Sequence, residues 1–194
     1  MFIQVMQAKC SRPDEVRAFA EKWSQDVSDG FLGGTFGVTA DGVFLGIVRF
    51  ASQEAAMANS ARPETDALSQ EFASLMDGPI DFADYDDVSQ FLDGGSDDAG
   101  FVQVVRGKVD DPSRAKALND NPGPIREMRP EIIGGMLAFA ADGSFTETVY
   151  FTDEASARAG EAVEPPPEVA AEMGYVMAGA TFYDLSNPWF DSAG

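Results

Sequence analysis

The sequence has no histidine, and it has a single cysteine, Cys10, among its 194 residues. Without histidine the chain cannot build a Ser-His-Asp or Cys-His catalytic arrangement, the usual zinc site or a histidine-ligated haem. A lone cysteine excludes an intrachain disulfide, so we interpret Cys10 as a small packing residue at the end of a strand. These absences remove whole classes of enzyme and metal protein.

Basic residues are scarce as well, with 13 lysines and arginines against 33 aspartates and glutamates and a formal net charge of −20. Such a chain repels phosphate backbones and anionic lipid, so we expect neither nucleic acid nor a membrane as a partner. No apolar run reaches the roughly 18–20 residues of a membrane span. The alternating start over residues 1–9 is unlike a signal peptide. A cytoplasmic location is the resulting expectation.

What the sequence does contain is an internal repeat. Corresponding segments recur in the same order at a spacing of roughly one hundred residues, which is the signature of a duplication. The clearest matches are Phe2-Ile3-Gln4-Val5 with Phe101-Val102-Gln103-Val104, Leu32-Gly33-Gly34 with Ile133-Gly134-Gly135, Ala40-Asp41-Gly42 with Ala141-Asp142-Gly143, and Phe82 and Asp84 with Phe182 and Asp184. Between the copies, residues 93–100 are rich in glycine and aspartate, as is typical of a linker. We therefore predict two domains, residues 1–95 and 96–194.

Each copy has the pattern of a β-α-β-β-α-β unit. Apolar periodicity predicts strands in the first copy over residues 2–8, 33–39, 43–50 and 79–85. A helix opens after Ser11, the expected N-cap, and its apolar stripe continues to Val27. A second helical region starts near Glu54 and is interrupted by Pro63, and Asp41-Gly42 suits a type I′ hairpin turn. This order is that of the ferredoxin-like plan.

The predicted fold class is therefore α+β, with two tandem ferredoxin-like units. Such a unit has a four-stranded sheet with helices on one face, and the other face needs a partner to cover its apolar side chains. Two copies in one chain supply that partner. We expect the open sheet faces to meet as an intramolecular dimeric α+β barrel, in a chain that is a monomer with an internal pseudo-dimer or a homodimer.

The two-copy plan resembles the dimeric α+β barrel superfamily, which includes the antibiotic biosynthesis monooxygenase domains. The segments that carry the resemblance are Val48-Arg49-Phe50-Ala51-Ser52-Gln53-Glu54-Ala55-Ala56, Asn59-Ser60-Ala61-Arg62-Pro63-Glu64, Gly100-Phe101-Val102-Gln103-Val104, Tyr150-Phe151-Thr152 and Pro188-Trp189. The resemblance implies a small-molecule enzyme that needs no cofactor and holds a phenol-like substrate between its sheet and its helices. It also implies a substrate-binding role for Asn59, which lies in the helical region that matches the family's asparagine.

Strand parity selects further ligand-binding candidates. Gln4 and Gln103 occupy equivalent positions on otherwise apolar strand faces, so each needs a hydrogen-bond partner or a ligand. The alternative is that the two glutamines pair with each other and set the register of the two units. Trp23 lies on the apolar stripe of the first helix, where it either packs in the core or lines a ligand site.

The third strands differ between the copies, and this difference selects the catalytic candidates. Glu147 shares a strand face with apolar residues, so it is either exposed at an edge or buried with a raised pKa, and a buried glutamate would be a candidate general base. Arg49 either pairs with such a carboxylate, binds an anionic ligand or forms an ordinary salt bridge. Tyr150 replaces Arg49 in the second copy, so we look for a site there first.

Two functions remain open at this point. The first is a cofactor-independent monooxygenase or isomerase acting on a small aromatic or polyketide-like molecule. The second is a non-catalytic α+β barrel protein that binds a small molecule or is stress-related. Two differences from the family favour this second function. Pro63 stands where the family's tryptophan would follow Asn59, and the closing strand around residues 80–83 has no arginine. We expect no metal and no cofactor for either function.

Overall fold

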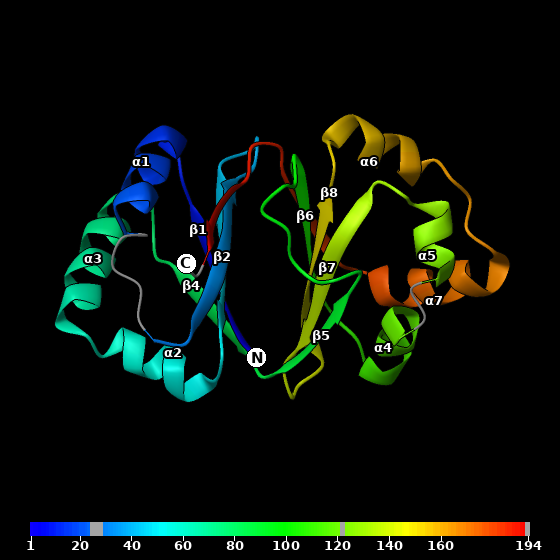
Figure 1. Cartoon of the computed structure of the whole chain (residues 1–194), viewed down its shortest axis with the longest axis horizontal. Coiled ribbons are helices and arrows are strands. Elements are labelled where there is room, and N and C mark those ends of the chain that lie inside the picture. The colour runs from blue at the N-terminus through cyan, green and yellow to red at the C-terminus, as the bar shows by residue number, and fades with distance from the viewer. Residues whose placement is uncertain (24–28, 121–122, 193–194) are drawn as a thin grey trace. The chain divides into compact units, whose positions relative to one another are not determined.

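The computed structural model describes residues 1–23, 29–120 and 123–192, and it divides into two compact units (Figure 1). The first unit comprises Met1–Asp86 and Asn187–Gly194, and the second comprises Asp87–Ser186. These bounds differ from the expected division at residue 95. The reason is that the segment after each copy's closing strand forms a short strand in the sheet of the other copy.

The first unit contains a five-stranded antiparallel sheet in the order β10-β2-β3-β1-β4. Its strands are β1 (Phe2–Lys9), β2 (Phe31–Val38), β3 (Val43–Phe50), β4 (Asp81–Tyr85) and β10 (Trp189–Ser192). Its helices are α1 (Pro13–Trp23), α2 (Gln53–Ser60) and α3 (Pro63–Ser74). The break between α2 and α3 falls at Pro63, as predicted, because proline suits the first turn of a helix and lacks the N–H that a helix interior needs.

The second unit repeats this plan with the strand order β5-β7-β8-β6-β9. Its strands are β5 (Asp87–Phe91), β6 (Phe101–Lys108), β7 (Ile132–Phe139), β8 (Ser144–Phe151) and β9 (Thr181–Leu185). Its helices are α4 (Pro112–Asp120), α5 (Gly123–Met128), α6 (Glu154–Glu161) and α7 (Pro167–Met177). In the described part of the chain, no helix is long and apolar enough to cross a membrane.

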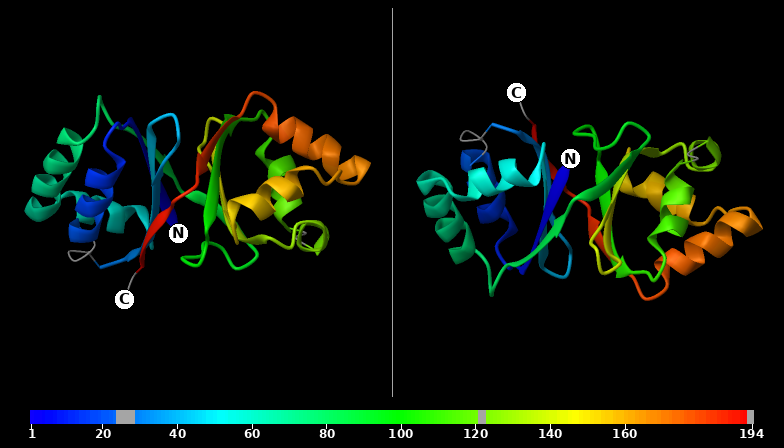
Figure 2. Two further views of the ribbon diagram at one scale, coloured as in Figure 1. Left: turned by 90° about the horizontal axis from the view of Figure 1, so that it is seen from above. Right: turned by 90° about the horizontal axis from the view of Figure 1, so that it is seen from below.

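In each unit the helices lie on one face of the sheet (Figure 2), as the ferredoxin-like plan requires. The core between sheet and helices of the first unit includes Ala8 and Phe44 from the sheet, Phe19 from α1 and Phe72 from α3. Residues at even positions of β1 and β3 therefore face the helices, and the odd positions face away from them. The predicted α+β class and the tandem ferredoxin-like duplication are confirmed.

Two local predictions are wrong, and a third concerns a residue outside the described part of the chain. Among the residues of the turn between β2 and β3, Gly42 alone has a positive φ, 82°, whereas a type I′ turn needs two such residues. Ser11 is not the N-cap of the first helix, because α1 starts two residues later, at Pro13. The Ser11 hydroxyl donates instead to Asp77 Oδ1, 3.0 Å away. Val27, the last member of the expected apolar stripe, lies outside the described residues.

Candidate functional site

The second unit contains a cavity of about 530 Å³ between its sheet and its helices. The floor is the helix-facing side of β6, β7 and β8, where Val105, Leu137 and Val149 lie. Val176 and Met177 of α7 contribute to the opposite wall. A cavity of this size with a mostly apolar lining is typical of a site for a small organic ligand.

Glu147 is a polar residue in the middle of the floor of this cavity. It lies in the middle of β8, opposite Val105 of β6 and Leu137 of β7 in the sheet register. The side chain keeps some accessible surface where it lines the cavity, but protein atoms pack densely around the carboxyl group. Burial raises the pKa of Glu147 to about 7, because an apolar environment disfavours the charged form. Within the described residues, no hydrogen bond or ion pair reaches this carboxyl group.

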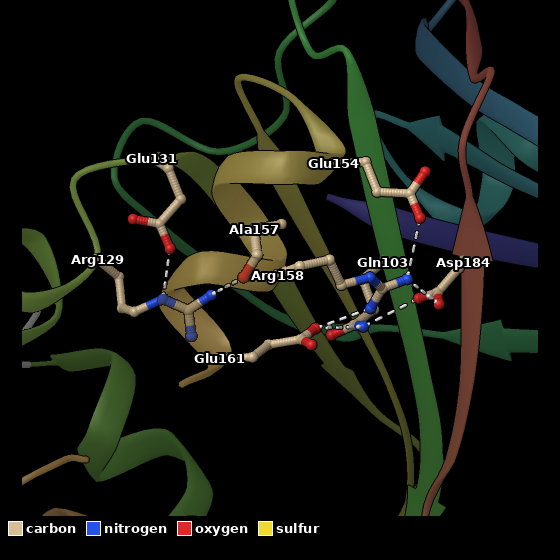
Figure 3. Close-up of polar contacts among 8 residues, drawn as sticks. All are labelled: Gln103, Arg129, Glu131, Glu154, Ala157, Arg158, Glu161 and Asp184. Atoms are coloured by element: carbon tan, nitrogen blue, oxygen red, sulfur yellow. Dashed lines mark hydrogen bonds and ion pairs between the residues drawn. The ribbon is translucent and has the colours of Figure 1, made fainter. Parts of the chain in front are cut away.

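A network of charged and polar side chains lies at one edge of the cavity (Figure 3). Arg158 of α6 donates to Glu161 at 2.9 Å and to Glu154 at 3.2 Å, and it also contacts Asp184 of β9. Gln103 Nε2 donates to Asp184 at 3.0 Å and to Glu161 at 3.4 Å. The hydrogen bond that Arg158 donates to the Asp184 carboxylate raises the pKa of Arg158. One guanidinium is thus held by three carboxylates.

A second arginine, Arg129, lines the cavity further from solvent. It forms an ion pair with Glu131 and donates to the carbonyl oxygen of Ala157 at 3.3 Å (Figure 3). The exposed fractions of the two ion-paired side chains are 18% and 10%, so both charges are largely removed from water. No cluster of three or more potential metal ligands occurs in the parts of the chain that the structure describes.

In the first unit, side chains crowd the sheet position that corresponds to Glu147. The sheet register places Gly46 where the second unit has Glu147, opposite Met6 and Phe36 instead of Val105 and Leu137. A β-carbon at Gly46 would lie 2.9 Å from Met6 Cε and 3.0 Å from Phe36 Cδ1. A larger side chain at this position would therefore have to displace Met6 and Phe36.

The strand exchanged between the copies adds to this difference. Trp189 of β10 lies opposite Phe36, and the centres of their stacked rings are 6.3 Å apart. In the second unit the residue that lies opposite Leu137 from β5 is Ser89. A large aromatic residue in one copy and a small polar one in the other therefore leave the second unit with the open space.

Among the predicted site residues whose side chains the structure describes, Glu147 and Gln103 line the cavity. Tyr150 is buried on the opposite face of β8, because neighbouring strand residues alternate between faces. Arg49 lies in the first unit and donates to Thr35 Oγ1 at 3.3 Å. Tyr150 and Arg49 are therefore not among the residues that line this cavity.

The remaining predicted ligand-binding residues belong to the first unit. Gln4 Nε2 donates to Asp84 at 3.0 Å, just as Gln103 does to Asp184. The alternative in which the two glutamines pair with each other is therefore wrong, because both lie on helix-facing sides and each bonds within its own sheet. Asn59 lies in the last turn of α2, and Trp23 ends α1 with a side chain outside the described part of the structure.

Sequence reasoning missed the two arginines and their carboxylate partners. A usable signal existed for Arg158, since Glu154 and Glu161 lie four residues before and three after it on one helix, the spacing at which side chains meet. Asp184 repeats Asp84 and could have been paired with the repeated glutamines. Arg129 and Glu131 are only two residues apart, but their burial depends on how the loop before β7 packs against α6, which the local sequence does not indicate.

The comparisons with known proteins agree with this fold. No protein-family model matches the sequence, and a comparison with curated proteins finds no match. A solved structure of a candidate monooxygenase from Lactobacillus acidophilus is 13% identical, covers 100% of this chain and 97% of its own, and superposes with a TM-score of 0.72. An anthrone oxidase-like protein is also 13% identical, covers 99% of this chain and 94% of its own, and has a TM-score of 0.64.

A third solved structure resembles the chain less closely. It is a ferredoxin-fold protein from Listeria monocytogenes related to antibiotic biosynthesis monooxygenases, 8% identical, with a TM-score of 0.51 over 95% of this chain and 94% of its own. At these identities the likeness shows the fold alone. The fold expected from the resemblance is thereby confirmed: over at least 95% of its length, this chain superposes on solved structures that include a ferredoxin-fold protein related to antibiotic biosynthesis monooxygenases.

Proposed function

We propose that this protein is a cofactor-independent monooxygenase or isomerase acting on a small aromatic or polyketide-like molecule. Its site is the cavity of the second unit, and Glu147 is the general base. The observation that carries the proposal is a carboxyl group without a partner among the described residues, with a pKa of about 7, in the floor of an apolar cavity of about 530 Å³. A base with a pKa near neutrality is well matched to proton transfer at neutral pH.

The chemistry follows from that carboxylate. Glu147 would remove a proton from an activated C–H or a phenolic O–H of the bound molecule and leave an electron-rich anion inside an apolar site. With an anthrone, the anion would react with O₂: the ring CH₂ becomes C=O, one oxygen atom enters the product, and the other leaves as water with the two hydrogens. Without O₂, return of the proton to another carbon would give an isomer. An anthrone is a reasonable first substrate because one structural neighbour is anthrone oxidase-like.

The difference between the two copies supports one such site in each chain. Gly46 takes the position of the base in the first unit, and Met6 and Phe36 occupy the space beside it. A single working site explains why Glu147 has no counterpart in the other copy of the repeat.

The test is oxygen uptake with hydroxylated naphthalenes and anthrones, comparing the wild type with Glu147→Gln. Loss of a general base lowers the rate by about 10²–10⁴-fold, whereas the control Glu164→Gln, at an exposed position, keeps the wild-type rate. For the wild type, kcat/KM rises with pH through about 7, since the base must be deprotonated in the free enzyme. No turnover with any member of the panel would contradict the enzymatic function.

One observation favours non-catalytic ligand binding as a second candidate. Both arginines that line the cavity are already paired with carboxylates, so within the described lining the positive charge that could stabilise an anion formed from the substrate is already neutralised. Native mass spectrometry of protein purified from its own cells separates the candidates: a retained small molecule that is not turned over supports binding alone. A cytoplasmic location, and a chain that is either a monomer or a homodimer, are part of both candidates.

A further inference from the structure

The charges around the cavity of the second unit are strongly unbalanced. Three carboxyl groups line it, those of Glu147, Glu161 and Asp184, against the guanidinium groups of Arg129 and Arg158. The ion-pair partners of these arginines add the carboxyl groups of Glu131 and Glu154. Five carboxyl groups thus surround two guanidinium groups in the described residues.

The two cations are also poorly placed to accept an anionic ligand. Arg158 already donates to three carboxylates (Figure 3), and Arg129 donates to Glu131 and to a backbone carbonyl oxygen. An anion that bound either guanidinium would lie beside the carboxylate that already neutralises its charge. Displacing that carboxylate would be costly, because it would leave a partly buried charge without compensation.

An anion in the cavity would also lose its hydration. Its transfer into an apolar space is unfavourable unless a cation or several hydrogen-bond donors receive it, and the floor offers Val105, Leu137 and Val149 beside Glu147. Two like charges repel more strongly in this environment than in water. A neutral ligand meets neither penalty, and a hydroxyl group on it could donate to the Glu147 carboxylate.

We propose that this cavity selects its ligand by charge: it admits uncharged aromatic molecules and rejects carboxylates, with Glu161 and Asp184 at its edge as the residues that determine this specificity. The inference rests on the proposed site in the second unit, but it does not depend on catalysis there. It narrows the substrate class to neutral phenols, anthrones, esters and amides, and it excludes their free acids.

The experiment compares two ligands of nearly the same shape, 6-hydroxy-2-naphthamide and 6-hydroxy-2-naphthoate, by isothermal titration calorimetry at pH 8. The expected result is that the amide binds the wild-type protein at least tenfold more tightly than the carboxylate. Glu161→Lys should reduce that ratio at least threefold by reversing one charge at the edge, and the milder Glu161→Gln should reduce it in the same direction. Asp98→Lys makes the same charge reversal at an exposed loop position away from the cavity lining and should keep the wild-type ratio.

The outcomes separate this inference from the proposed function. Equal affinity for the two ligands, or no binding of either, overturns charge selection. If Glu161→Lys and Asp98→Lys change the ratio of amide to carboxylate affinity equally, Glu161 does not determine the charge selection. Tight binding of the amide, together with no turnover of any member of the wider panel, keeps the charge selection and contradicts the enzymatic function. Turnover of both ligands at similar kcat/KM keeps the enzymatic function and contradicts the charge selection.

Discussion

At the scale of single residues, Glu147 shows how much one position depends on its neighbours. The same strand position holds Gly46 in the first copy, where the side chains of Met6 and Phe36 lie so close that a larger residue would have to displace them. In the second copy Val105 and Leu137 are smaller, and a carboxyl group fits. Its raised pKa is the consequence of being placed among apolar residues without a cation.

The pKa of Glu147 predicts how stability changes with pH. Because the folded-state pKa, about 7, lies above the ordinary value of 4.5, the folded protein binds this proton more tightly than the unfolded chain does. Its contribution to stability is therefore complete below about pH 4.5 and is lost as the pH rises through 7. Glu147→Gln removes this dependence, so the variant should gain up to about 3 kcal/mol relative to the wild type between pH 4.5 and pH 8.

Urea unfolding of both proteins at several pH values measures this difference. Glu164→Gln serves as the control for the loss of one exposed carboxyl group, and its difference from the wild type should show no comparable step. Parallel stability curves for Glu147→Gln and the wild type would show that Glu147 is hydrated in the folded protein.

The Arg129–Glu131 pair provides a second prediction at this scale. Its charges are largely buried, so Arg129→Met leaves Glu131 without a partner and should lower the free energy of unfolding by about 2–3 kcal/mol. Adding Glu131→Gln removes the uncompensated charge and should restore at least half of that loss. Thermal and urea unfolding of the four proteins of this cycle give the coupling between the residues. Additive effects would mean that the pair contributes little.

At the scale of elements, the longer strands and the proline-bounded helices were predictable from the sequence, whereas β5 and β10 were not. The strands β1, β3, β6 and β8 have eight residues each and a clear apolar periodicity. By contrast, β5 and β10 have five and four residues, and they form only because a neighbouring sheet edge is available. A strand of that kind leaves little local signal, since its stabilising partner is far away in the sequence.

The exchanged strand β10 leads to a prediction about the first unit. Deleting residues 187–194 removes the pairing partner of β2 and the Trp189 ring that packs on Phe36 and Phe44. We expect a loss of about 3 kcal/mol, comparable to removing a packed tryptophan, and faster amide hydrogen exchange over residues 31–38. Exchange over residues 144–151 of the second unit should stay close to that of the full chain.

Trp189→Ala keeps the backbone of β10 and separates the two effects. It should reproduce most of the loss of stability but less of the increase in hydrogen exchange. If the deletion leaves exchange over residues 31–38 unchanged, β10 does not contribute to the first sheet in solution.

At the scale of the whole molecule, duplication has produced two units with the same plan but different interiors. The prediction is that the filled and open interiors can be altered separately. Leu137 occupies the position in the second unit that Phe36 occupies in the first. Leu137→Phe therefore puts a phenylalanine ring into the cavity, and it should reduce the affinity for 6-hydroxy-2-naphthamide at least tenfold. The fold should be kept, with a change in stability within about 1.5 kcal/mol, because the added ring enters existing space.

The matched variant is Phe36→Leu in the first unit. It removes buried volume beside Gly46 and should lower the free energy of unfolding by about 1–3 kcal/mol, while affinity for the amide stays within twofold. Calorimetry should also give one ligand per chain for the wild type. Two equivalent sites per chain, or equal effects of both substitutions on affinity, would contradict the division into a filled and an open unit.

The amino-acid sequence by itself determined the duplication, the α+β order of elements in each copy and the exclusion of histidine-based chemistry, because these depend on residue identity and local periodicity. It also singled out Glu147 and Gln103 as polar residues on apolar strand faces. Only the tertiary structure decided that Glu147 lines a cavity, that Tyr150 faces away from it and that Arg158 is held by carboxylates from two elements. It also decided which sheet receives β5 and β10. These features arise from packing between residues distant in the chain, where the volume of a neighbour such as Phe36 or Leu137 determines whether a space is filled or open.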